Sequence, residues 1–186
     1  MSRRGYMTGN LAGSLLLAHP SMTDPSFQHS VVLISAHSDE GAVGVILNRP
    51  LGKSLGEFKT EVITDNLSEI PVFVGGPVGD RQIILSAWQA SESLGAFKLY
   101  FGLDAEKAGE MVSGGTDMAM RAFVGYAGWG EGQLENELTQ NTWVVAPVDA
   151  ELMNEYEGDD LWRSILTKVD PELRLTSEEP EDLSLN

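Results

Sequence analysis

Hydrophobic residues fall in eight short runs along the chain, and these runs predict β-strands. Most of them are continuous rather than alternating in polarity, which is typical of strands that are buried on both faces or that lie inside a curved sheet. Such a sheet needs a covering layer. The runs are LLLA at 15–18, VVLI at 31–34, VGVIL at 43–47, VFV at 72–74, IIL at 83–85, FKLYF at 97–101, RAFVGY at 121–126 and TWVVA at 142–146.

Helical spacing of apolar residues occurs mainly in the second half of the chain, and it predicts four helices that can cover the sheet. Asp104 and Asp149 precede the first and third of these segments, and Asp159 or Asp160 precedes the fourth. Each of these residues is a candidate N-cap. The four segments are 105–114, 133–140, 150–157 and 161–169.

The order of these elements predicts an α+β fold in a single compact domain, and an α/β three-layer sandwich is the alternative. With 186 residues, 42% of them hydrophobic, the chain is long enough for one substantial core, and no linker divides it. The last residues, TSEEPEDLSLN, are acidic and predict a solvated tail. We therefore expect a flexible N-terminus at 1–8, one domain at 9–172 and an acidic tail at 173–186.

Charge and cysteine content exclude several classes of function. The chain has 28 acidic residues against 12 Lys and Arg, a net charge of -16, which opposes contact with nucleic-acid phosphates. Cysteine is absent, so disulfides and thiolate chemistry are excluded. The run LAGSLLLA at 11–18 imitates a signal-peptide core, but His19 and Pro20 follow it directly and a buried strand is favoured. We expect a cytoplasmic protein with no membrane partner.

Three blocks of sequence closely resemble the YqgE/AlgH family of bacterial proteins. The resemblance runs from about residue 9 to about residue 170, and it implies an α+β fold with a curved, partly barrel-like sheet and helices packed outside it. It implies no agreed reaction, cofactor or catalytic residue, and some members are called transcriptional regulators. The chain departs from the family pattern at Ser86, Ala87 and Trp88, where His-Ser is more usual. The blocks are GSLLLAHPSMTDPSFQHSVVLISAHSDEGAVGVILNRPLG (13–52), VFVGGPVGDR (72–81) and RAFVGYAGWGEGQLENELTQNTWVVAP (121–147).

The segment GYAGWGEGQLENE at 125–137 is a candidate binding loop between a predicted strand and a predicted helix. Glu131 and the absence of a nearby Lys or Ser/Thr oppose a phosphate site there, and the glycine spacing fails the dinucleotide pattern. Two interpretations remain. The glycines permit positive φ and close packing over Tyr126 and Trp129, or they leave the ring of Trp129 free to project as a stacking surface for a ligand or partner.

Two other turns carry polar residues at strand ends. Gly75-Gly76-Pro77 follows the run VFV, and its backbone N–H groups are candidates to hold an anion together with Arg81. Asn48-Arg49 ends another strand, where ligand groups often converge. If these turns meet in the fold, both arginines line one pocket with Asn48 and Trp129. The alternative is that the turns are structural and that the arginines pair with surface acids.

The histidines His19, His29 and His37 lack compact metal-ligand spacing, so no metal site is predicted. His37 follows the run VVLI and precedes a Ser-Asp pair, which suits either proton exchange beside a pocket or a role in the turn. No serine occupies a G-x-S-x-G elbow, which opposes a serine hydrolase.

The sequence therefore predicts a noncatalytic regulatory protein that binds a small ligand or a protein partner and uses no cofactor. One alternative is an enzyme of unassigned type that uses His37, Asn48, Arg49 and Glu135, and a pocket with His37 in hydrogen-bond reach of a carboxylate favours it. Another is a DNA-binding regulator, which the net charge opposes. The predicted ligand-binding residues are Trp129, Tyr126, Asn48, Arg49, Arg81, Gly75, Gly76 and His37.

Overall fold

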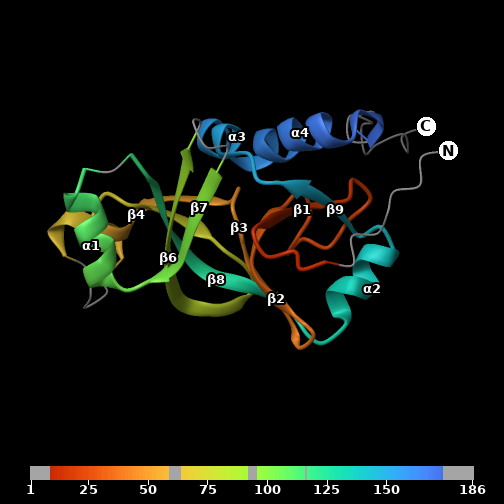
Figure 1. The fold of residues 1–186 in the computed structure, drawn as a ribbon, viewed down its shortest axis with the longest axis horizontal. Coiled ribbons are helices and arrows are strands. Elements are labelled where there is room, and N and C mark those ends of the chain that lie inside the picture. Colours follow the sequence, from red (N-terminus) through yellow and green to blue (C-terminus); the bar gives the residue numbers. More distant parts are fainter. Residues whose placement is uncertain (1–8, 59–63, 92–95, 116, 174–186) are drawn as a thin grey trace, which may run out of the picture.

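The computed structural model describes residues 9–58, 64–91, 96–115 and 117–173, in which nine strands form one open mixed sheet (Figure 1). Along the sheet the order is β4-β5-β8-β3-β2-β1-β9, and β6 lies off this path, paired with β7 and β8. The β5–β8 pair is parallel, and the other pairs are antiparallel. The strands are β1 Ser14–Ala18, β2 Val31–Ser38, β3 Gly41–Ile46, β4 Pro50–Ser54, β5 Pro71–Val74, β6 Val78–Ser91, β7 Ala96–Leu103, β8 Ala119–Trp129 and β9 Trp143–Pro147.

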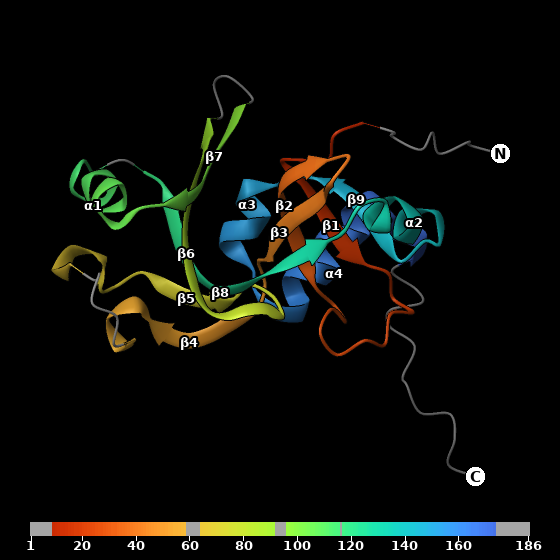
Figure 2. The ribbon, with the colours of Figure 1, turned by 90° about the horizontal axis from the view of Figure 1, so that it is seen from below.

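The long strand β8 joins the two halves of the sheet, and in Figure 2 it runs from the side of α1 toward α2. Its first part pairs with β5 and β6, and its last three residues pair with β3. This path brings Trp129 opposite Ala42 at the end of the β2–β3 hairpin. The candidate site lies at this junction.

Four α-helices of the described residues lie outside the sheet. In Figure 1, α3 and α4 lie along one side of the sheet, while α1 and α2 lie at opposite ends of the molecule. Two short 3-10 helices, η1 and η2, precede β5, and η2 packs beside α1. The helices are α1 Ala105–Ser113, α2 Gln133–Thr139, α3 Ala150–Glu155 and α4 Gly158–Val169, with η1 Leu55–Glu57 and η2 Asp65–Leu67.

Side chains that alternate along β1 enter two different hydrophobic clusters. Leu15 and Leu17 pack in the cluster that contains Trp162 of α4, whereas Leu16 packs in the cluster that contains Leu134 of α2. All five are almost fully buried. Both faces of this part of the sheet are therefore covered, which is the physical reason why its strands read as continuous apolar runs.

The predicted α+β fold with a curved, partly barrel-like sheet is confirmed, and the sheet remains open. Each of the eight apolar runs coincides with a strand, except that Leu47 and Thr142 lie one residue outside β3 and β9. The sequence does not predict β4, because its residues PLGKS are polar or exposed. Asp104 and Asp149 cap α1 and α3 through their side chains. The predicted cap of α4 is wrong, because this helix starts at Gly158, so that both candidate aspartates lie in its first turn.

No helix in the described ranges is long and apolar enough to cross a membrane. The predicted flexible N-terminus at 1–8, and residues 174–186 of the predicted acidic tail, lie outside the described residues.

Candidate functional site

A hollow of about 270 Å³ opens at the end of the β2–β3 hairpin, beside the last residue of β8. Two of the predicted ligand-binding residues, His37 and Trp129, line it. The complete lining is Ala36, His37, Ser38, Glu40, Gly41, Ala42, Val43 and Trp129. The hollow is thus built by the hairpin and one tryptophan, and the other predicted residues lie elsewhere.

A bulge and a glycine shape this hairpin. The pairing of β2 with β3 shifts by one residue at Ser35, whose hydroxyl donates to the carbonyl oxygen of Val43 at 3.1 Å. Such a bulge bends a strand and redirects the residues that follow it. At the turn, Gly41 has φ +137°, and a Cβ there would lie 2.1 Å from the carbonyl oxygen of Trp129. Glycine is required for the turn to approach β8 so closely.

Both ring nitrogens of His37 are hydrogen-bonded. Nδ1 accepts from the backbone N–H of Leu11 at 2.9 Å, and Nε2 lies 2.6 Å from Oε1 of Glu135. Because Nδ1 is an acceptor, the neutral ring carries its hydrogen on Nε2 and donates it to the carboxylate. The His37 side chain is 10% exposed, whereas Glu135 is 51% exposed. This hydrogen bond is the main cause that lowers the pKa of Glu135.

Trp129 does not project from the loop, so of the two interpretations the structure supports close packing and not a freely stacking ring. Its side chain packs in the apolar cluster beneath α2, and the residue is 6% exposed. Its Nε1–H donates to Oε2 of Glu137 at 2.9 Å, and Trp143 donates to the same oxygen at 2.8 Å. Phe27 packs against both indole rings, with centroid distances of 6.4 and 5.6 Å. The flanking glycines leave room, but these neighbours fill it.

Gly75 and Gly76 of one candidate turn and Gly125 of the candidate loop serve one close backbone crossing between the end of β5 and β8. A Cβ on Gly125, where φ is +75°, would lie 2.4 Å from the carbonyl oxygen of Gly76, and a Cβ on Gly76 would lie 2.2 Å from the carbonyl group of Tyr126. The N–H of Gly75 donates to Val124 O at 2.8 Å. The structural interpretation therefore accounts for these glycines. Tyr126 is half-buried against the main core cluster.

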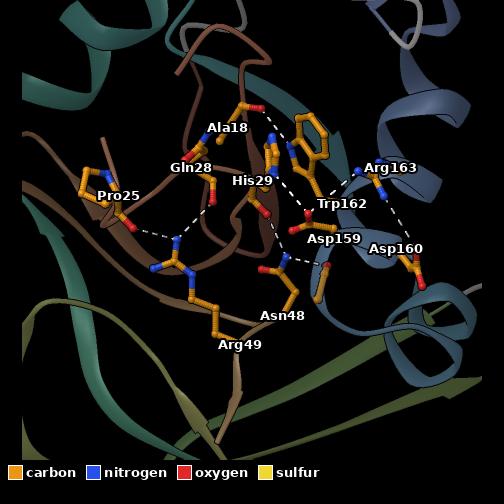
Figure 3. A network of polar contacts seen from close by, with 11 residues as sticks. Ala18, Pro25, Gln28, His29, Asn48, Arg49, Asp159, Asp160, Trp162 and Arg163 are labelled. Carbon is orange, nitrogen blue, oxygen red and sulfur yellow. Dashed lines mark hydrogen bonds and ion pairs between the residues drawn. The ribbon is translucent and has the colours of Figure 1, made fainter. Parts of the chain in front are cut away.

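Asn48 links the chain after β3 to the start of α4 (Figure 3), and it is not among the residues that line the hollow. Its side-chain oxygen accepts from the N–H of Val31 at 2.9 Å. Its side-chain nitrogen donates to the carbonyl oxygens of His29 and Gly158, both at 2.8 Å. The N–H of Gly158 in turn donates to the backbone carbonyl of Asn48. A buried amide with these partners is a structural element of the fold.

Arg49 bonds to backbone carbonyls of the loop before β2, as Figure 3 shows. Its guanidinium donates to Ser26 O at 2.6 Å and to Gln28 O at 3.1 Å. Burial is the main cause that lowers its pKa, against the opposing attraction of nearby aspartates. Arg81 is exposed in the irregular first part of β6. The two arginines therefore do not line one pocket with Trp129.

The most buried cation of the described residues, Arg121 on β8, was not predicted as a site residue. It is 8% exposed, and it donates to Leu47 O at 2.8 Å and to Met153 O at 2.6 Å. Its guanidinium lies over the rings of Phe73 and Trp88, 4.3 and 4.8 Å from their centroids. Burial lowers its pKa to about 10. A lone Arg at the start of the apolar run RAFVGY was the available signal.

Leu11, Glu137 and Trp143 were also missed as neighbours of the site. Leu11 acts through its backbone, which no side-chain pattern reports. Glu137 reads as a solvent-facing residue of a short helix until the two indole N–H groups are seen to meet its carboxylate. The run TWVVA signals the contact of Trp143 with Glu137, because a buried tryptophan N–H usually finds an acceptor.

Comparison with protein families places the chain among bacterial relatives. The AlgH-like family model matches residues 15–174, a range that contains His37, Trp129 and Glu135. A UPF0301 protein of Xanthomonas campestris pv. campestris is 36% identical over 176 residues, covering 89% of this chain and 93% of that protein. A UPF0301 protein of Streptomyces coelicolor is 33% identical over 193 residues, covering 95% and 96%.

Two solved structures share the fold. A crystal structure of a Corynebacterium diphtheriae protein is similar with a TM-score of 0.68 and 26% sequence identity, covering 89% of this chain and 91% of that chain. The solution structure of the AlgH protein from Pseudomonas aeruginosa is similar with a TM-score of 0.67 and 23% identity, covering 98% and 100%. At that identity the second likeness shows the fold alone.

Proposed function

This chain belongs to the AlgH-like family, and from that premise and the geometry of the hollow we propose that it is a noncatalytic binding module for a basic protein partner. The partner presents a Lys or Arg side chain to the hairpin hollow. One observation carries the proposal: His37 lines the hollow, yet both of its ring nitrogens are already bonded within the protein. The hollow can contact a ligand, but while these two hydrogen bonds are made its histidine offers that ligand no ring nitrogen.

The same geometry weakens the enzyme alternative. A general acid or base must reach the proton that it transfers, directly or through one water. His37 meets the expected arrangement of a histidine beside a carboxylate, but its two bonds turn the ring inward. Glu135 has a lowered pKa, which makes its carboxylate a weak base near neutral pH. We therefore favour binding over turnover.

The size of the hollow favours a protein side chain over a small molecule. Sites that enclose drug-sized ligands have volumes of roughly 300–1,000 Å³ and bury most of the ligand surface. This hollow has about 270 Å³ and opens to solvent at a hairpin end. Its volume suits one long side chain, with Ala42 and Trp129 as apolar wall for the methylene stem.

The acidic residues in and around the hollow favour a basic partner. Glu40 lines the hollow and the lining contains no Lys or Arg, while Asp39 and Glu135 lie beside it. The chain as a whole carries a formal charge of -16. Such a field attracts basic surfaces and repels nucleic acid. The role we propose is regulatory, through partner binding in the cytoplasm.

Reversing the charge of Glu40 tests the hollow directly. Binding of a fluorescein-labelled octalysine peptide, followed by fluorescence anisotropy at low salt, is expected to weaken about five- to tenfold in Glu40→Lys, because an attractive carboxylate becomes a repulsive ammonium. The matched control is Glu69→Lys, an exposed residue that follows η2. η2 packs beside α1, which lies at the end of the molecule opposite α2 (Figure 1). The control is expected to change affinity less than about twofold.

Three outcomes would contradict the proposal. Equal weakening by both variants would indicate general charge attraction without a site at the hollow. Failure of the wild-type protein to bind the peptide would exclude the basic partner. The third outcome comes from native mass spectrometry of gently purified protein. A reproducible excess of mass from a small molecule, lost in Glu40→Lys but kept in Glu69→Lys, would indicate a small ligand in place of the protein partner.

A further inference from the structure

The described segment before β1 is fastened to the core through a titratable ring. Leu11 is 3% exposed and lies in the apolar cluster that contains Trp129 and Leu134. Its backbone N–H donates to Nδ1 of His37. The neighbouring link is a backbone–backbone hydrogen bond, from the N–H of Gly13 to the carbonyl oxygen of Ile34 at 2.7 Å. A proton can break the first of these two bonds but not the second.

Protonation of His37 reverses the role of Nδ1. In the neutral ring this nitrogen offers a lone pair to Leu11, whereas in the imidazolium it carries a hydrogen, so that two N–H groups face each other. The opposite nitrogen keeps its hydrogen bond to Glu135, and that contact becomes an ion pair. The ring therefore remains in place while the amide of Leu11 loses its acceptor and must move.

The charged residues of α2 and of the hairpin turn are acids, whereas the cation of β8, Arg121, lies near the other end of that strand and bonds to Leu47 and Met153. Glu131 precedes α2, Glu135 and Glu137 lie on it, and Asp39 and Glu40 occupy the hairpin turn, while residues 9 to 13 carry no charge. The carboxylate of Glu137 is bonded to two indole N–H groups. The ring therefore lies close to carboxylates, and the Leu11 N–H is the donor directed at its Nδ1.

We propose that Leu11, His37 and Glu135 form a proton-sensitive latch. Uptake of one proton from solvent by Nδ1 of His37 releases residues 9 to 12 from the core and uncovers the apolar surface of Leu134 and Trp129, while the hydrogen bond from Gly13 to Ile34 remains. The latch acts in the isolated chain. It does not rest on the basic partner, and failure of the peptide experiment leaves it intact.

The amide of Leu11 reports the latch in the full-length protein. We expect hydrogen exchange of this amide, measured by ¹H–¹⁵N NMR and corrected for the intrinsic pH effect, to speed up at least about tenfold between about pH 7.5 and about pH 5.5. The exchange of core amides in β1 is expected to stay constant. The ¹⁵N shifts of the ring should show hydrogen on Nε2 alone at the higher pH.

Two variants separate the latch from a general loosening of the N-terminus. In His37→Asn, the side-chain oxygen takes the place of Nδ1 and accepts from Leu11 without titrating, so the exchange should become independent of pH. In Glu135→Gln, loss of the carboxylate disfavours the imidazolium, so release should move to lower pH. Constant Leu11 exchange while His37 titrates would overturn the latch, and so would an unchanged pH response in His37→Asn.

Discussion

Trp129→Ala is expected to lower the free energy of unfolding by about 3–5 kcal/mol, the range for truncating a buried aromatic residue. The ring is 6% exposed and packs between Phe27 and Trp143. Its removal leaves a cavity and deprives the carboxylate of Glu137 of one of its two indole donors. Urea unfolding followed by circular dichroism measures the change without depending on tryptophan fluorescence.

Trp129→Phe is the matched control for the hydrogen bond. It keeps most of the aromatic volume and loses the N–H, so we expect a smaller loss of about 1–3 kcal/mol. A loss below about 1 kcal/mol in the alanine variant would contradict the buried position of the ring. Because Trp129 contributes to the core and also lines the hollow, its variants do not isolate binding, which is why Glu40 carries that test.

The fold could be predicted because a buried strand requires apolar residues that are consecutive in the sequence. Leu15, Leu16 and Leu17 face alternate sides of the sheet, and all of them enter a hydrophobic core. A continuous apolar run is the sequence consequence of a strand that is covered on both faces. The edge strand β4 shows the converse, because its exposed residues PLGKS carry no apolar signal.

The sequence identifies polar residues that could form a site, but it does not predict the hydrogen-bond partners of their side chains. Asn48 and Arg49 are predicted ligand-binding residues because polar groups at strand ends often meet a ligand, and here they meet the protein's own backbone. The side chains are equally suited to both roles, so the choice depends on which carbonyls the fold brings near. That proximity is set by tertiary packing, for Arg49 by the loop before β2.

Sequence distance explains what was found and missed around His37. The sequence predicts Glu135 only as a catalytic residue of the enzyme alternative, because its position 98 residues from His37 gives no local signal of contact. The pair forms because β8 crosses to the hairpin and places α2 over it. Trp129 illustrates the same limit, since its flanking glycines describe the freedom of the loop and not the neighbours that fill the space.

Arg121→Ala is expected to destabilise the protein about as strongly as Trp129→Ala does, by roughly 3–5 kcal/mol. The substitution empties a packed site and leaves two buried carbonyls without donors. The guanidinium joins three elements: it extends from β8, bonds to Leu47 after β3 and bonds to Met153 in α3. No carboxylate within 4.0 Å pairs with it in the described part of the chain. Its charge is therefore held by carbonyl dipoles and by the rings of Phe73 and Trp88, with a longer-range attraction from Glu157.

Arg121→Met decides which part of that cost comes from packing. Methionine restores much of the apolar volume between Phe73 and Trp88 and removes a charge that is expensive to bury, while both carbonyls stay unpaired. We expect a loss of about 1–3 kcal/mol in urea unfolding, clearly smaller than that of the alanine variant. Equal losses would mean that the two hydrogen bonds dominate and that the rings contribute little. A methionine variant as stable as wild type would instead show that the buried cation is retained for a reason other than stability, and would make Arg121 a candidate for function.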